Sequence, residues 1–394
     1  MRSARRWGVL AAGVAAVVAL VGTTGGSASV KQGGPIVIGW AFDAKGQMAP
    51  FDGPALATAK IRVKEINAKG GVNGRRLRLD TCDTQNNNPA RAKSCARKLL
   101  GNGADIIFTT CDVDFATPVV QEAINRGVLA ISTCIGTDQM GPKRFGKTKG
   151  RLAFSFGNVA QDEGSAMAEY AYRRGWRTAG LGTNTLLVYF KNVVQAFDKR
   201  FTQLGGRIVA RENYATGANN VQTAVTRLNS QRADVYVTST AFGELPAFVS
   251  GFRSLGNRTP ILNSWAGDGT YWVTKSPEVT NYYAVTYASV FGDEPNAAVR
   301  KLGKTVKAAT GGFVQGAGTI DGIVTAIKRA NGSTNGAALA TQLEKFKKVP
   351  TLAGKVSFSK QLHSVFGRQY RVIQIQDNKG KLVGSVTAKV VPKI

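Results

Sequence analysis

Short apolar segments alternate with amphipathic segments along most of the chain. The apolar residues of 36–42 and 77–81 have the spacing of strands, and those of 53–68 have the spacing of a helix. The alternation continues as helix 89–100, strand 106–110, helix 117–126 and strand 128–132. Strands separated by helices of this length pair in parallel through right-handed crossovers. The pattern therefore predicts an α/β fold with a doubly wound sheet.

A second round of the same alternation begins after Arg151. The predicted helices are 161–174, 188–204, 221–230 and 245–255, and the predicted strands are 178–182, 207–210, 235–238 and 260–263. The rest of the chain predicts strand 283–287, helices 297–309, 320–330 and 337–346, and closing strands 370–375 and 382–390. This second round predicts a second α/β lobe.

The first residues have the pattern of a secretory signal peptide. Three arginines within the first six residues precede an apolar run over 8–21, which is followed by small residues. The run is shorter than the roughly 20 residues that a membrane helix needs, although an uncleaved anchor is the alternative interpretation. We expect residues 1–28 to be removed near Ala28. No cysteine that would carry a lipid tether lies nearby. The protein is then exported, to the periplasm or the extracellular face of the envelope.

The chain is strongly basic, with 52 Lys and Arg against 24 Asp and Glu and a formal charge of +28. The basic residues are dispersed and lack interleaved aromatics, which disfavours nucleic acid as a partner. Two groups are densest: Lys143, Arg144, Lys147, Lys149 and Arg151, then Lys345, Lys347, Lys348 and Lys355. We interpret both as solvated surface, and attraction to an anionic envelope or a partner surface is the alternative.

One segment carries a family resemblance. Residues 61–79 read IRVKEINAKGGVNGRRLRL, in which Gly70 and Gly71 suit a helix end and Asn73-Gly74 suits a tight turn. This segment resembles the leucine/isoleucine/valine-binding protein family of bacterial transport systems. Residues 39–53, 80–83 and 315–330 extend the likeness along the chain.

The resemblance implies the type I periplasmic-binding-protein fold, in which two Rossmann-like lobes joined by three crossovers close around a ligand. It places the crossovers near 151–156, 284–287 and 358–365. The first lobe then comprises 35–152 plus 286–358, and the second comprises 153–285 plus 359–394. It also implies delivery of a small-molecule ligand to an ABC permease. We expect a monomer without cofactor or metal.

The resemblance also assigns candidate ligand-binding residues at the strand ends, where doubly wound sheets bind ligands. The first-lobe residues are Phe51, Asp112, Asp114, Cys134 and Thr137, and the second-lobe residues are Tyr189, Phe242, Trp265 and Asp268.

The chain departs from the family after the third strand. Amino-acid binders of the family resemble one another in holding the ligand carboxylate with serine and threonine hydroxyls, whereas this chain reads Thr110-Cys111-Asp112-Val113-Asp114. A carboxylate that faces the ligand's carboxylate repels it unless one is protonated or bridged. A plain branched-chain amino acid is therefore disfavoured, and an amide, amine or hydroxylated ligand is favoured.

The four cysteines are expected to form disulfides in an exported chain, and four cysteines allow three pairings. Cys111 and Cys134 end consecutive strands that should be neighbours, which pairs them and leaves Cys82 with Cys95. The family resemblance suggests Cys82 with Cys111 instead. Both pairings remain open at this stage.

Other motifs favour binding over catalysis. GPKRFGKT at 141–148 matches a phosphate-binding loop formally, but it neither follows a strand directly nor opens a helix. His363 is the single histidine and lies near the third crossover rather than at a strand end. A hydrolase using Asp112 and Asp114 is disfavoured, because these residues lie in a predicted loop and not on one strand face. A sensor for a membrane receptor or kinase is the remaining alternative to transport.

Overall fold

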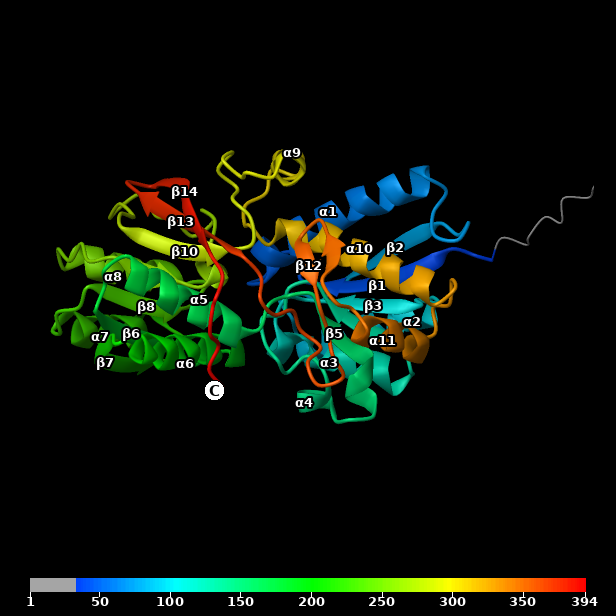
Figure 1. Cartoon of the computed structure of the whole chain (residues 1–394), viewed down its shortest axis with the longest axis horizontal. Coiled ribbons are helices and arrows are strands. Elements are labelled where there is room, and N and C mark those ends of the chain that lie inside the picture. Colours follow the sequence, from blue (N-terminus) through cyan, green and yellow to red (C-terminus); the bar gives the residue numbers. More distant parts are fainter. Residues whose placement is uncertain (1–32) are drawn as a thin grey trace, which may run out of the picture. The chain divides into compact units, whose positions relative to one another are not determined.

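The structure, a computed structural model, describes residues 33–394 and contains two α/β lobes, each with its own sheet (Figure 1). The fold predicted from the alternation of apolar segments is confirmed. The predicted signal peptide lies outside the described residues. The boundaries predicted for the two lobes stay a prediction.

The first lobe contains a parallel five-stranded sheet in the order β2-β1-β3-β4-β5. Its strands are β1 (Ile36–Phe42), β2 (Leu77–Asp83), β3 (Ile106–Thr109), β4 (Leu129–Ser132) and β5 (Ala153–Ser155). The central strands are buried on both faces, which explains their nearly continuous apolar sequences.

Helices cover both faces of this sheet. One face packs against α1 (Ala49–Ala68), α10 (Phe313–Arg329) and α11 (Gly336–Glu344), and the other packs against α2 (Pro89–Gly101) and α3 (Val113–Asn125). The shorter elements α4 (Pro142–Phe145), η1 (Lys149–Leu152), η2 (Trp265–Gly267), α9 (Ala297–Thr305), β11 (Val349–Thr351) and β12 (Gly354–Val356) lie outside the two large sheets. Because η1 and then β5 follow α4, the segment 141–148 lacks the strand–loop–helix context of a phosphate-binding loop.

Three helices begin four or more residues earlier than the sequence pattern predicts: α1 by four residues, α3 by four and α10 by seven. In α10, glycines interrupt the apolar pattern. They allow close packing, since a Cβ at Gly316 would overlap the Ala55 carbonyl of α1 and one at Gly322 would overlap the ring of Phe156. The glycines therefore bring α10 against the first lobe instead of ending the helix.

The second lobe contains a seven-stranded sheet in the order β14-β13-β10-β9-β8-β6-β7. Its strands are β6 (Thr178–Asn184), β7 (Arg207–Tyr214), β8 (Val235–Ser239), β9 (Ile261–Asn263), β10 (Tyr282–Thr286), β13 (Tyr370–Gln376) and β14 (Lys379–Val386). The strands from β7 to β10 are parallel, and β13 and β14 add an antiparallel edge.

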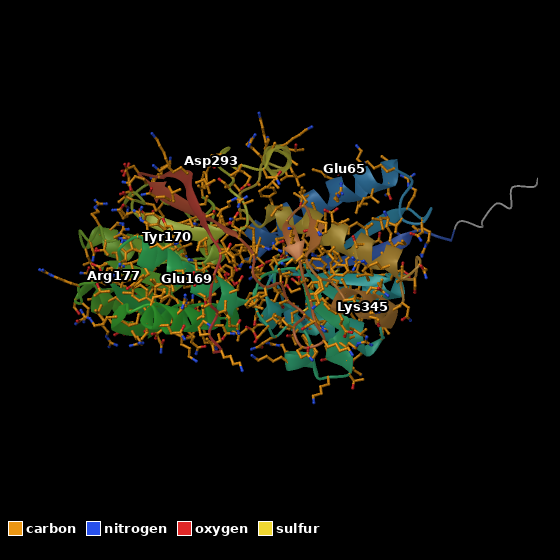
Figure 2. All side chains as sticks on the ribbon, in the orientation of Figure 1. Glu65, Glu169, Tyr170, Arg177, Asp293 and Lys345 are labelled. Atoms are coloured by element: carbon orange, nitrogen blue, oxygen red, sulfur yellow. A yellow bond between two sulfur atoms is a disulfide. The ribbon has the colours of Figure 1, made fainter. Side chains whose placement is uncertain are left out.

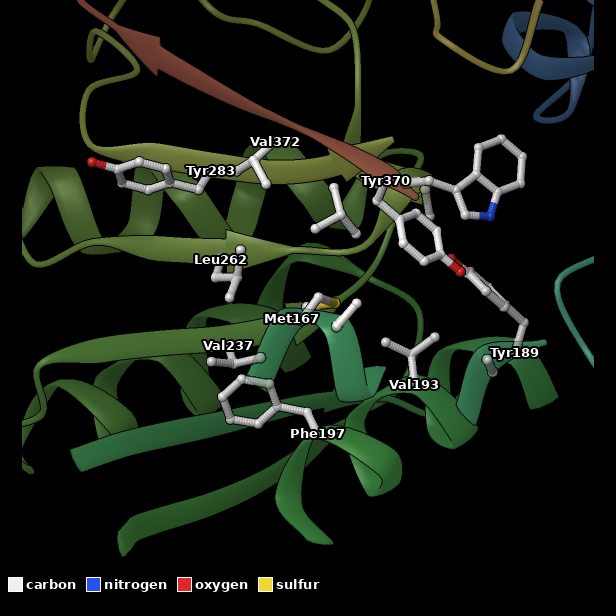
Figure 3. Close-up of a cluster of buried hydrophobic side chains, with 14 of the residues drawn as sticks. Met167, Tyr189, Val193, Phe197, Val237, Leu262, Tyr283, Tyr370 and Val372 are labelled. Atoms are coloured by element: carbon white, nitrogen blue, oxygen red, sulfur yellow. The ribbon is translucent and has the colours of Figure 1, made fainter. Parts of the chain in front are cut away.

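Two helix pairs cover this second sheet. One face packs against α5 (Ala160–Arg173) and α6 (Val188–Gln203), and the other packs against α7 (Ala218–Asn229) and α8 (Glu244–Ser254). Figure 3 shows the core between the sheet and the first pair, with Met167, Phe197 and Leu262 in its interior. Tyr189 lies at the edge of this core, in the first turn of α6.

Two of the chain segments that connect the lobes run side by side. The backbone N–H of Ser155 donates to the carbonyl of His363 over 2.8 Å, and Val159 donates to Val365 over 3.0 Å. The Val365 N–H donates in turn to Gly157 over 2.9 Å. These bonds pair the two connecting segments into a short two-stranded element, which we call the hinge.

Charged side chains are spread over both lobes, and Glu65, Arg177 and Lys345 are exposed examples (Figure 2). In the two basic groups of the sequence, Lys143, Lys147, Lys149, Lys345, Lys347, Lys348 and Lys355 are all exposed. This distribution favours the interpretation of both groups as solvated surface. Of the helices within residues 33–394, none combines the length and the apolar character that a bilayer crossing requires.

Candidate functional site

A small pocket lies where the strand ends of the two lobes face each other. Its free volume is about 20 Å³, which is room for about one water molecule. The first lobe contributes Met48, Phe51, Cys111 and Asp112, and the second contributes Leu187, Tyr189, Phe190, Ala241, Phe242, Trp265 and Ala266. Most of these side chains are apolar or aromatic, and Asp112 is the charged residue among them.

Five of the nine residues predicted from the sequence line this pocket together: Phe51, Asp112, Tyr189, Phe242 and Trp265. The other four, Asp114, Cys134, Thr137 and Asp268, lie around it without lining it. Thr137 is buried and its carbonyl accepts a hydrogen bond from Ser364 over 2.7 Å at the hinge. Direct ligand contact by any of the nine stays a prediction.

Asp112 is both the N-cap of α3 and the acid of the pocket. Its Oδ1 accepts hydrogen bonds from the backbone N–H groups of Asp114 and Phe115, over 2.8 and 3.2 Å. Its Oδ2 has no hydrogen-bond partner within residues 33–394. Burial raises the pKa of Asp112 to about 7, and the nearby Asp114 carboxylate adds to the rise. The group therefore changes charge near neutral pH.

The aromatic wall of the second lobe is held by Glu163 of α5, which sequence reasoning missed. One oxygen of Glu163 accepts from the Tyr189 hydroxyl over 2.8 Å, and the other accepts from the Trp265 backbone N–H over 2.7 Å. Burial raises the pKa of Glu163 to about 8. In the sequence, the only sign of this role is a pair of acids, Asp162 and Glu163, at the start of a helix.

Trp265 provides a hydrogen-bond donor beside the pocket. Its indole Nε1 is buried and has no partner among the described residues. The ring packs edge-on against Phe51 of the first lobe, with centroids 5.1 Å apart, and lies tilted against Tyr287, with centroids 5.3 Å apart. A buried donor without a partner is costly, so a ligand acceptor at this position would stabilise the site.

Besides the Phe51–Trp265 packing, three further contacts join the lobes around the pocket. The Asp114 carboxylate, which pairs with Arg144 of its own lobe over 2.9 Å, accepts from the Val188 N–H, at the start of α6, over 3.0 Å. Asp268 accepts from the Gly311 N–H over 2.7 Å. A Cβ added to Gly136 would lie 2.6 Å from the Tyr189 ring. The first-lobe loop after β4 thus touches the aromatic wall directly.

The structure contains the disulfides Cys82–Cys95 and Cys111–Cys134, with Cα atoms 5.5 and 4.9 Å apart. These are the pairs inferred from neighbouring strand ends, rather than the Cys82–Cys111 pair that the resemblance suggested. Cys111 lines the pocket, so the Cys111–Cys134 bond ties this part of the pocket lining to the loop after β4.

Two other features are unsuited to the same role. A larger groove of about 820 Å³ runs along α1, α9 and α10, away from the strand ends, and mixed charges such as Arg62 and Asp321 line it. His363 is buried under the hinge, where Nδ1 lies 2.9 Å from the Ala153 carbonyl and the ring stacks on Phe154. Burial lowers the pKa of His363, and the residue serves the hinge packing.

Sequence comparison agrees with this architecture, because the model of the periplasmic binding protein family matches residues 35–381. The chain belongs to the periplasmic binding protein family. This membership confirms the predicted resemblance and the prediction of a binding protein rather than an enzyme.

Individual relatives of this periplasmic binding protein are distant. The chain is 24% identical over 329 residues to the Leu/Ile/Val-binding protein BraC3 of Rhizobium johnstonii, covering 79% of this chain and 86% of the relative. The isoleucine-bound LivJ of Streptococcus pneumoniae is similar in structure, with a TM-score of 0.76, 21% identity, and coverage of 91% of this chain and 100% of LivJ. A benzoate-bound solute-binding protein of Rhodopseudomonas palustris gives a TM-score of 0.73 at 17% identity, covering 91% and 98%. At these identities the structures support the fold alone.

Proposed function

We propose that this chain is the exported substrate-binding protein of an ABC importer, and that it captures a small amine, amide or amino-acid-like solute between its lobes and delivers it to a permease. We infer this ligand class mainly from Asp112, which is a buried acid within an otherwise apolar and aromatic pocket.

The pocket chemistry favours a ligand with an apolar body and a polar end that donates a hydrogen bond. The described residues that line the pocket include no Lys, Arg or His to neutralise an anion. A benzoate-like anion would instead meet Asp112, whereas an ammonium, amide or hydroxyl group would donate to it. An amide or amino acid would in addition offer an acceptor to the free Trp265 Nε1.

The closed geometry favours capture between lobes. A free volume of about 20 Å³ is far below the several hundred cubic ångströms typical of small-molecule pockets. A solute of amino-acid size therefore enters only when the lobes separate, and it is enclosed when they close.

Native mass spectrometry of the purified protein, followed by calorimetric titration of the compound found, tests this proposal. We expect a small solute that carries an amine, amide or hydroxyl group on an apolar body. Micromolar binding of leucine or valine would contradict the exclusion of plain branched-chain amino acids, which rests on Asp112. Unchanged uptake of the identified solute after deletion of the gene would contradict the transport role and favour sensing.

A further inference from the structure

A second, open pocket lies next to the ligand pocket, and the two share Phe242 as the one residue that lines both. The outer pocket has a free volume of about 580 Å³. Its lining is Gly46, Gln47, Pro50, Asn86, Phe242, Gly243, Pro246, Tyr271 and Trp272. Both lobes contribute to this lining, so the outer pocket, like the inner one, lies at the junction between them.

Phe242 has an unusual backbone for a bulky residue, with φ of 56°. Residues other than glycine and asparagine rarely adopt this left-handed conformation, and such strain concentrates at ligand clamps and switches. The ring is half-buried and packs against Phe190 with centroids 6.2 Å apart. The next residue, Gly243, is exposed and has open space around it. The Phe242 ring is therefore only partly packed, and the residue that follows it is an exposed glycine.

The outer pocket has the chemistry of a subsite for an uncharged group. Tyr271 and Trp272 provide aromatic faces, and Gln47 and Asn86 provide exposed amides. The described residues that line it include no charged side chain. Aromatic faces beside amides suit amide or hydroxyl groups on a carbon chain.

We propose that the outer pocket is a second ligand subsite, which takes an uncharged tail bearing amide or hydroxyl groups, and that Phe242 is the gate that decides whether a tail passes. The proposal rests on the proposed function, because the polar end of the same solute, here called its head, occupies the inner pocket. Phe242 is thus a specificity-determining residue, and Asp112 anchors the head.

Thiol labelling tests the gate without any ligand. Ala266→Cys places a thiol in the wall of the inner pocket, and its rate of reaction with N-ethylmaleimide is measured alone and combined with Phe242→Gly or Leu186→Ala. Leu186 is exposed and lines neither pocket, and glycine tolerates the backbone of residue 242. We expect labelling at least tenfold faster with Phe242→Gly and within threefold of the parent with Leu186→Ala.

The gate is overturned if Phe242→Gly labels no faster than Leu186→Ala. Circular dichroism checks the fold of each variant. Phe242→Asn replaces Phe242→Gly if the glycine variant unfolds, because asparagine also accepts the left-handed conformation.

Titration with two probes tests the tail subsite. Tyramine supplies the head alone, and its 4-O-triethylene glycol ether adds an uncharged tail. We expect Phe242→Gly to shift the affinity ratio at least tenfold towards the tailed probe, relative to the unaltered protein. An unchanged ratio overturns the subsite. If neither probe binds either protein, the ligand class of the proposed function is wrong. The labelling rates alone then test whether Phe242 controls access to the inner pocket.

Discussion

The two sides of the pocket are built differently. On the first-lobe side, covalent and backbone bonds hold the polar group: Cys111 is tied to Cys134, and Asp112 is fixed by the N–H groups that it caps. On the second-lobe side, rings form the wall, and a single buried acid, Glu163, holds two of them. The first side thus offers a fixed polar anchor, whereas the second offers an adaptable apolar surface.

This difference separates two determinants of specificity. A carboxyl group that is fixed at a helix terminus distinguishes ligands by their charge and hydrogen-bonding groups. A ligand that leaves a buried polar group without a partner loses much binding free energy. An aromatic wall discriminates by shape, which tolerates small differences in size. We expect changes on the first side to alter which functional group is bound, and changes on the second to alter how large a solute is enclosed.

Removal of the Cys111–Cys134 bond is expected to have the largest effect. The Cys111→Ser/Cys134→Ser protein should lose roughly 3 kcal/mol of stability in urea unfolding, because the bond closes a loop with a sequence separation of 23. Ligand affinity should also fall, since Cys111 lines the pocket.

The Cys82→Ser/Cys95→Ser protein is the matched control. This bond closes a loop with a separation of 13, so the stability loss should be similar, again roughly 3 kcal/mol. Neither residue lines the pocket, and ligand affinity should stay within twofold. Equal affinity losses in the two proteins would show that the first-lobe anchor does not depend on its own disulfide.

Asp112→Asn tests the anchor itself. Asparagine caps helices as well as aspartate does, so the unfolding free energy should change by less than about 1 kcal/mol. Affinity for an amine such as tyramine, measured by calorimetry at pH 8, should fall about 100-fold, because a charge-assisted hydrogen bond is lost. Asp198→Asn is the control, since Asp198 pairs with Arg211 on the second lobe and lies outside the pocket lining. Equal losses in both variants would argue against Asp112 as the anchor.

The second-lobe wall should make stability depend on pH through Glu163. Its folded pKa of about 8 lies above the model-compound value of 4.5, so the folded state retains a proton that the unfolded chain releases. This contribution to stability is present at low pH and is lost as the pH rises towards 8. Between pH 5 and pH 7 the loss should be about 2 kcal/mol in urea unfolding.

Glu163→Gln should remove most of this loss, because the amide keeps a neutral group beside Tyr189 and the Trp265 N–H. Asp52, Asp112 and Asp268 also have pKa values raised by burial to about 7, Asp162 has a pKa raised to about 6, and all four remain in both proteins. The difference between the two pH profiles therefore gives the contribution of Glu163 together with its charge coupling to Asp162 and Asp268. Parallel profiles would show that Glu163 does not carry the dependence.

The fold followed from the sequence because burial on both faces of a sheet produces a local pattern. Asp112 and Trp265 were predicted because the family resemblance assigns ligand-binding positions to the strand ends, which the hydrophobic pattern locates. Glu163 was missed because its partners are brought to it by folding, 26 and 102 residues away along the chain. The left-handed backbone of Phe242 has no sequence signal either, since the tertiary packing around the residue imposes it.

The smallest of the expected effects concerns the contact between the two sides. A Cβ at Gly136 would lie 2.6 Å from the Tyr189 ring, and this buried ring is held by Glu163 and cannot withdraw freely. Gly136→Ala should therefore oppose closure while leaving each lobe intact, with about tenfold weaker ligand binding and a melting temperature within about 2 °C of the parent protein. Gly53→Ala is the control, because a Cβ there meets open space close to the same pocket. Binding of the Gly136→Ala protein with parental affinity would mean that the aromatic wall moves with the ligand, so that the second side adapts even at the ring that Glu163 holds.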